Sequence, residues 1–139
     1  TGVPIDHGAP LSEYKTYAQL GAAILLKLGL GTNVIQAVPS PAVRRDRTYA
    51  SAVSLREWWQ KQGLRPVKVN LLTAGAHARQ QRLLFERALG PEVTVGVISV
   101  EGKDFDWHHW WRSSPGVRTV IGETLAYGYA RFLFHAPRD

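Results

Sequence analysis

The chain has 139 residues, of which 45% are hydrophobic and 20% are charged, a balance that is enough for one globular core and too little for two. It contains no cysteine, which excludes disulfides, thiolate metal sites and thiol nucleophiles. The longest apolar patch, residues 21–26, is interrupted by Lys27 and is far shorter than the run of about 20 residues that crosses a membrane. We therefore expect a single domain over residues 1–139 with no membrane span.

The net charge of +6 raises the question of a nucleic-acid partner. Arg44, Arg45 and Arg47 form the only tight basic cluster, and no basic stripe interleaved with aromatic residues occurs. We therefore expect no nucleic acid. An arginine beside a pocket instead matches a small phosphate or carboxylate, because the guanidinium group binds either with two hydrogen bonds.

In the first half of the chain, apolar residues at helical spacing predict a helix within residues 12–28, and a short β-prone run follows at residues 34–38. Asp46 or Thr48 can cap a second helix that continues to residue 62 and is closed by Gly63. One of the two adjacent tryptophans in this helix, but not both, should be buried, because successive helical residues differ by about 100° in direction (Trp58 and Trp59).

In the second half, residues 67–72 and 93–100 are predicted strands, and residues 77–89 are a predicted helix between them. The inward side of that helix should carry Leu84, Phe85, Ala88 and Leu89. The face of a last helix should comprise Val117, Val120, Ile121, Thr124, Leu125, Gly128 and Phe132. Strands that alternate with helices predict an α/β fold with a mainly parallel sheet covered by helices on both faces.

The most informative stretch is residues 67–90, where an apolar strand leads through a small-residue turn into a helix that opens with His77. In open parallel sheets, ligands bind at the carboxyl ends of the strands, where helix N-termini offer free N–H groups to anions. We therefore expect a site for a small anionic molecule near His77 and Arg79. A hydrolase that uses His77 as the base, oriented by Glu13 or Glu123, is also compatible with these residues.

Several motifs together resemble the bacterial YdcF/SanA/ElyC-like family of unknown function. They are the pair Thr1-Gly2, Glu13, the segments at residues 46–49 and 73–79, and the segment at residues 110–116 with Glu123. The resemblance covers nearly the whole chain. It implies a three-layer α/β/α Rossmann-like domain linked to the bacterial cell envelope, with one family member reported to bind S-adenosylmethionine. An envelope-associated or a cytoplasmic location would fit.

The resemblance also implies the ligand-binding residues, which are Thr1, Gly2, Glu13, Arg47, Thr48, His77, Arg79 and Glu123. We expect them to gather in one cleft at the strand ends. The chain departs from the family pattern at Ala50, Ser51 and Gln80, which stand where many members have glutamate, asparagine and arginine. Family members usually begin with a strand and a glycine-rich turn before the Thr1-Gly2 position, so the chain is interpreted as incomplete at its N-terminus, where a membrane anchor could lie.

Each candidate also has a structural explanation. Glu13 in a first helical turn would suit the helix dipole, and Thr48 would serve as an N-cap. Glu123 lies mid-helix near the inward face, where a carboxylate needs a buried partner such as an arginine. Two adjacent histidines, His108 and His109, follow two aspartates, but adjacent histidines point in different directions, so we expect no metal.

Two hypotheses follow for the function. The first is a domain that binds a small anionic or nucleotide-like ligand, with S-adenosylmethionine as a cofactor implied by the resemblance and with His77 as the candidate catalytic residue. The second is a non-catalytic interaction module that presents the tryptophan-rich surface of residues 107–111 to an envelope partner. The sequence does not decide whether the protein is an enzyme.

Overall fold

The structure is a computed structural model that describes residues 1–5, 13–100 and 104–136. The chain forms two compact units, residues 1–65 and residues 66–139. Within the described residues, no helix combines the length and the apolar character that crossing a bilayer requires. The assignment of residues 1–139 to one domain stays a prediction.

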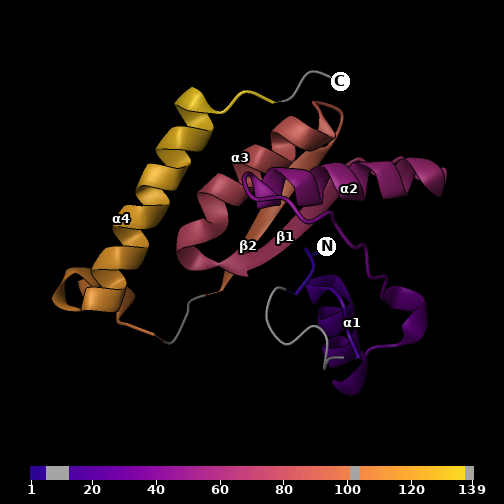
Figure 1. Cartoon of the computed structure of the whole chain (residues 1–139), viewed down its shortest axis with the longest axis horizontal. Coiled ribbons are helices and arrows are strands. Elements are labelled where there is room, and N and C mark those ends of the chain that lie inside the picture. The colour runs from indigo at the N-terminus through magenta and orange to yellow at the C-terminus, as the bar shows by residue number, and fades with distance from the viewer. Residues whose placement is uncertain (6–12, 101–103, 137–139) are drawn as a thin grey trace. The chain divides into compact units, whose positions relative to one another are not determined.

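The first unit contains two helices, α1 (Tyr17–Lys27) and α2 (Arg47–Lys61), shown in the indigo and purple part of Figure 1, and the short 3₁₀ turn η1 (Thr32–Val34). A capping box starts α1: the Thr16 hydroxyl accepts a hydrogen bond from the backbone N–H of Gln19, and the Gln19 side chain accepts one from the Thr16 backbone N–H. The chain after α2 turns at Gly63, whose φ of 68° suits glycine. The sequence therefore predicts that both helices of this unit exist.

Three expectations for the first unit are wrong. Residues 34–38 form no strand. Val34 ends η1, and the isolated parallel bridge beside this run joins Pro39 to Gly2. Glu13 precedes α1 rather than lying in its first turn. The N-cap of α2 is Asp46 in a left-handed conformation, so Thr48 lies inside the helix and does not cap it. Two proline residues flank residue 40, and proline cannot donate a ladder hydrogen bond, which disfavours a strand there.

The tryptophan expectation is also wrong in its simple form. Both Trp58 and Trp59 are half-buried, and the fully buried residue of α2 is Ala52. The indole is large enough that each ring covers part of the helix surface and still reaches solvent. The rotation of about 100° per residue makes the two indoles point in different directions, but neither ring is fully buried.

The second unit is a parallel β-α-β arrangement. Strands β1 (Lys68–Ala74) and β2 (Thr94–Val100) pair in parallel, with Lys68 opposite Thr94 and Ala74 opposite Val100, and α3 (Ala78–Leu89) connects them. Figure 1 shows α3 lying against the strand pair. This confirms the α/β class and the parallel pairing. The connection through α3 is long enough to bring the chain back to the end of the sheet at which β1 begins, so that β2 runs in the same direction.

The core of the second unit lies between α3 and the sheet. The predicted inward residues of α3 are all buried, with exposed fractions of 3% for Leu84 and 0% for Ala88. They meet Leu71, Thr73 and Val95, which alternate along one face of the sheet. On the opposite face, Leu72, Ile98 and Val100 are exposed.

A last helical segment completes the unit. The 3₁₀ segment η3 (Trp107–Arg112) leads into α4 (Ser114–Gly128), which continues as the π-helical turn η4 (Tyr129–Leu133). The predicted apolar face of this segment is partly wrong, because Ile121, Leu125 and Phe132 are exposed. The side that packs carries Gly116, Ala130 and Phe134, which are buried, and Glu123, which is half-buried.

Candidate functional site

A pocket of about 420 Å³ lies at the carboxyl ends of the two strands. Gly75 and Ala76, which directly follow β1, line it, and so does Ser99 near the end of β2. Because the strands are parallel, these ends meet at one edge of the sheet, which is where ligands bind in α/β proteins. The volume is within the usual range for small-molecule sites.

Aromatic side chains form the walls of this pocket. Trp107 and Trp110 from η3 and Tyr127 from α4 line it. The ring of Trp107 lies so close to Gly75 that a Cβ added there would be 3.4 Å from two of its carbon atoms. The edge of the Trp107 ring therefore lies within contact range of the turn that follows β1.

Glu123 extends from the middle of α4 into the same pocket. Its Oε1 atom lies 2.9 Å from Nδ1 of His77, the residue that precedes α3. The Glu123 side chain is 18% exposed and the His77 side chain 47%. The expected partner was an arginine, and the structure places a histidine there instead, because the turn after β1 brings His77 against α4.

The second carboxylate oxygen of Glu123 has a different hydrogen-bonding environment. Oε2 is buried and accepts no hydrogen bond from any residue that the structure describes. Native proteins leave few buried polar atoms unpaired, because the desolvation of such an atom is not offset. Oε2 is therefore enclosed by protein without a donor among the described residues, whereas Oε1 is paired with His77.

Arg79 supplies a positive charge to the pocket. It lies in the first turn of α3, and its exposed side chain lines the cavity. Within the described part of the chain, its guanidinium forms no ion pair. Three residues later on the same helix, Arg82 is engaged by Glu86 at 2.8 Å and does not line the pocket. Among the described residues that line the pocket, Arg79 is therefore a cation without an ion pair.

The structure brings together three of the predicted ligand residues, because His77 contacts Glu123 and both Arg79 and Glu123 line one pocket. The other five belong to the first unit and are Thr1, Gly2, Glu13, Arg47 and Thr48. Among them, Arg47 lines a separate hollow of about 380 Å³ with Arg44 and Val3. The backbone of Gly2 lies against the start of α1, where a Cβ would meet Tyr17 and Ala18. That all eight residues share one cleft stays a prediction.

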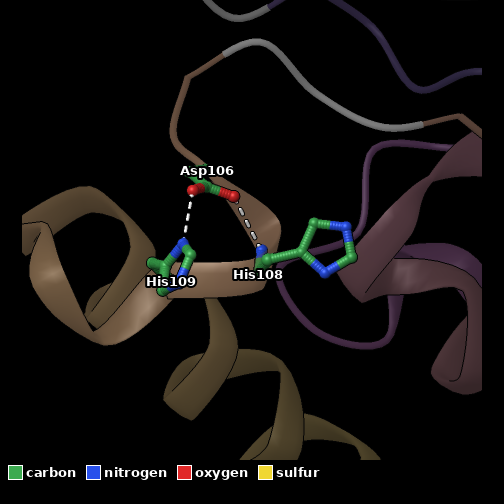
Figure 2. A network of polar contacts seen from close by, with 3 residues as sticks. All are labelled: Asp106, His108 and His109. Atoms are coloured by element: carbon green, nitrogen blue, oxygen red, sulfur yellow. Dashed lines mark hydrogen bonds and ion pairs between the residues drawn. The ribbon is translucent and has the colours of Figure 1, made fainter.

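The rings of the two adjacent histidines, His108 and His109, point in different directions (Figure 2). Figure 2 shows the carboxylate of Asp106 between them, accepting from the His108 backbone N–H at 2.8 Å and lying 2.7 Å from Nδ1 of His109, while the His108 ring points away. These bonds hold the pKa of Asp106 below its ordinary value of 3.8, the side-chain bond from His109 being the larger cause. Asp106 thereby caps η3, the segment that carries Trp107 and Trp110.

The sequence assigned the tryptophans mainly to an interaction surface and did not predict Ser99, Thr124 or Tyr127 as site residues. Ser99 was accessible to the same rule that located His77, since it lies at the end of the second parallel strand. Glu123, Thr124 and Tyr127 lie three, four and seven residues after Val120, which is the helical spacing of residues on one side of α4. The contact between Trp107 and Gly75 joins residues 32 positions apart and leaves no spacing signal in the sequence.

Comparison of the chain with models of protein families, with curated protein sequences and with solved structures finds no match. The resemblance to the YdcF/SanA/ElyC-like family stays a prediction from the motifs in the sequence.

Proposed function

We propose that the protein binds a small anionic or nucleotide-like ligand in the pocket at the carboxyl ends of β1 and β2. The observation that carries this proposal is the position of Arg79, which lies in the first turn of a helix beside a cavity with aromatic walls and has no ion pair with any described residue. A guanidinium group and the N-terminus of α3 both favour negative charge. Trp107 and Trp110 offer faces on which a planar ring can stack.

We assign no reaction to this pocket. His77 is half-exposed and does not line the cavity, so its role in the proposal is to hold the Glu123 carboxylate in place through Nδ1. S-adenosylmethionine is included among the ligands to be tested because the family resemblance implies it. A role in the bacterial envelope is proposed on the same ground.

We also propose that the domain has the three-layer Rossmann-like arrangement that the resemblance implies. In support, one face of the β1–β2 sheet is apolar and exposed, with Leu72 at 71% and Ile98 at 54%. Two strands are few for a stable sheet, and an apolar sheet face is normally covered by helices.

The test of the binding proposal compares two arginines of one helix. Wild-type protein, Arg79→Ala and Arg82→Ala are titrated by isothermal calorimetry with AMP, CMP, S-adenosylmethionine and inorganic phosphate. We expect binding of at least one compound, weakened about tenfold or more by Arg79→Ala, since a charge-assisted hydrogen bond contributes about 1.5–3 kcal/mol. Arg82→Ala, which removes only the exposed pair with Glu86, should bind like wild type.

Absence of binding to all four compounds, or equal affinity of wild type and Arg79→Ala, contradicts the binding proposal. The alternative, an interaction module at residues 107–111, rests on one observation, the 57% exposure of Trp111. Trp107 and Trp110 line the pocket, whereas Trp111 does not. The alternative therefore requires that Trp111→Ala abolishes binding of an envelope protein and that added nucleotides leave that binding unchanged.

A further inference from the structure

One side of the last helical segment carries a row of exposed apolar side chains. Leu125 in α4 is 69% exposed and Phe132 in η4 is 77% exposed, although both are large hydrophobic residues. Each member of the row lies three or four residues from another member, and residues at that spacing share one side of a helix. We name this row the α4 stripe, and its members are Ile121, Leu125, Tyr129, Phe132 and Leu133. A continuous apolar row along one helix is the pattern of an interaction surface.

The rest of the second unit holds this segment from its other side. Gly116, Ala130 and Phe134 are buried there, and Arg87 of α3 donates to the backbone carbonyl oxygens of Ala130 and Arg131. The residues of α4 that line the strand-end pocket are not members of the α4 stripe. The packing that buries one side of the segment therefore leaves the stripe facing outward, as a surface distinct from the ligand pocket.

The exposed charges of this segment have one sign. Arg118 in α4 and Arg131 in η4 are both exposed. Arg118 precedes Leu125 by seven residues, which is about two helical turns and places it on the same side of α4. Between residues 107 and 136 the sequence contains one acidic residue, Glu123, and its side chain is half-buried. The outer side of the segment is therefore both apolar and positively charged.

This combination fits the surface of an anionic lipid bilayer. Helices that lie in the bilayer interface turn leucine and aromatic side chains toward the acyl chains and place cations among the headgroups. A second copy of the chain fits less well, because pairing two such surfaces brings arginines of like charge together. A protein partner needs an acidic groove shaped to one projecting helix, whereas a lipid interface adapts to the helix that enters it.

We propose that the α4 stripe docks the protein on bilayers that contain anionic phospholipids. In this arrangement α4 lies along the bilayer plane, and the stripe enters the boundary between headgroups and acyl chains by about 5–10 Å. Arg118 and Arg131 meet the acidic groups of the lipids. Docking through this surface does not require the ligand pocket, so it is independent of the binding function proposed above.

The test is sedimentation of the full chain with vesicles of two compositions. One contains phosphatidylserine and phosphatidylcholine in equal amounts, and the other contains phosphatidylcholine alone. At about 0.15 M salt we expect binding to the anionic vesicles and binding to the neutral ones that is about tenfold weaker or more, because each arginine near an anionic surface contributes about fivefold. Absence of binding to the anionic vesicles overturns the proposal.

Leu125→Ser tests the apolar part of the surface. Because the side chain enters the interface, its loss should weaken binding to the anionic vesicles by about fivefold or more. The matched control is Leu28→Ser in the first unit, where the side chain is 72% exposed. This control should bind within about twofold of wild type. If Leu125→Ser does not fold, as judged by circular dichroism, Phe132→Ser gives the same comparison at the other end of the stripe.

Two double variants separate the position of the charge from its amount. Arg118→Ala with Arg131→Ala removes two charges from the α4 segment, and Arg44→Ala with Arg45→Ala removes two exposed charges from the first unit. The first should weaken binding to anionic vesicles about tenfold or more, and the second about threefold or less. Equal losses would show that the net charge of +6, and not this surface, attracts the protein, and would overturn the proposal.

Other occupants of the stripe give different results. A dimer that Leu125→Ser converts to a monomer in light scattering, together with no vesicle binding by wild type, shows that a second copy covers the stripe and overturns the proposal. A monomer that binds no vesicles overturns it in favour of an acidic protein partner. Vesicle binding that Leu125→Ser leaves unchanged overturns the assignment to this surface. Losses in Leu125→Ser and in the α4 arginine pair, with both controls near wild type, support it.

Discussion

His77 Nδ1 lies 2.9 Å from Glu123 Oε1, so that the turn after β1 is joined to the middle of α4. The two residues are 46 positions apart in the sequence, and of the two only Glu123 lines the strand-end pocket. Because Glu123 is largely buried and His77 is half-exposed, the pair is intermediate between a surface ion pair and a buried one.

A double-mutant cycle with His77→Ala and Glu123→Ala should therefore give a coupling free energy of about 1 kcal/mol in urea unfolding. The matched control is the Arg82–Glu86 pair, which is more exposed on both sides, at 58% and 41%. Its coupling should be about 0.3–0.5 kcal/mol, as for exposed helical pairs. A His77–Glu123 coupling no larger than that of the control would contradict the contact.

Two glycines of α4 should respond to alanine in opposite ways. A Cβ on Gly116 would collide with the backbone carbonyl of Trp110 and approach Ser113 Oγ, so Gly116→Ala should destabilise the protein by about 1–3 kcal/mol. Gly122 has open space around it, and Gly122→Ala should stabilise the helix by about 0.5–1 kcal/mol. Thermal unfolding of both variants checks this, and a neutral Gly116→Ala would show that η3 does not pack on α4 as described.

Arg87 should be among the most important surface-facing residues for stability. From α3 it donates to the carbonyl oxygens of Ala130, Phe134 and Arg131 at 2.6, 3.0 and 3.1 Å, which satisfies the end of the last helical segment. Arg87→Ala should cost about 2 kcal/mol, and Arg87→Lys should recover less than half, because an ammonium lacks the guanidinium fork.

The control for that prediction is Arg118→Ala, which removes an exposed arginine of α4. Its free energy of unfolding should stay within about 0.5 kcal/mol of wild type. If Arg87→Ala is as mild as Arg118→Ala in urea titrations, the carbonyl contacts do not stabilise the protein.

Asp106 predicts a pH dependence of stability. Its folded-state pKa is lowered by the hydrogen bonds from His109 and His108, so its contribution is present above the ordinary value of 3.8 and is lost as pH falls through the folded value. The difference in Tm between wild type and Asp106→Asn should be greatest above about pH 5 and should shrink as pH falls below 3.8. Asp104→Asn, at an exposed aspartate two residues earlier, should show no such trend.

The parallel β-α-β core could be predicted from the sequence because its signals are local. Alternating apolar residues marked both strands, and residues at helical spacing marked the buried side of α3 from Leu84 to Leu89. The outward residues of α4 were misjudged for a physical reason. Ile121 and Leu125 follow helical spacing as well as buried residues do, and only the tertiary packing of Gly116 and Ala130 decides which side faces inward.

The rule that ligands bind at strand ends located the site, but it did not identify all of the residues that line the pocket. His77 and Arg79 follow directly from their place after β1. The partner of Glu123 could not be predicted, because a contact across 46 residues depends on how α4 packs against the turn at Gly75. The first half of the chain shows the same limit, since proline residues near Val38 interrupt a run whose composition is typical of a strand.

The central claim is that a nucleotide-like anion binds among Trp107, Trp110 and Arg79. Two-dimensional ¹H–¹⁵N NMR on the full chain, titrated with AMP and with CMP, tests this most directly, because each indole N–H gives its own signal. The account predicts saturable shifts of the Trp107 and Trp110 signals in wild type that require about tenfold more nucleotide in Arg79→Ala. Signals that do not move, or that move equally in Arg79→Ala, would contradict it.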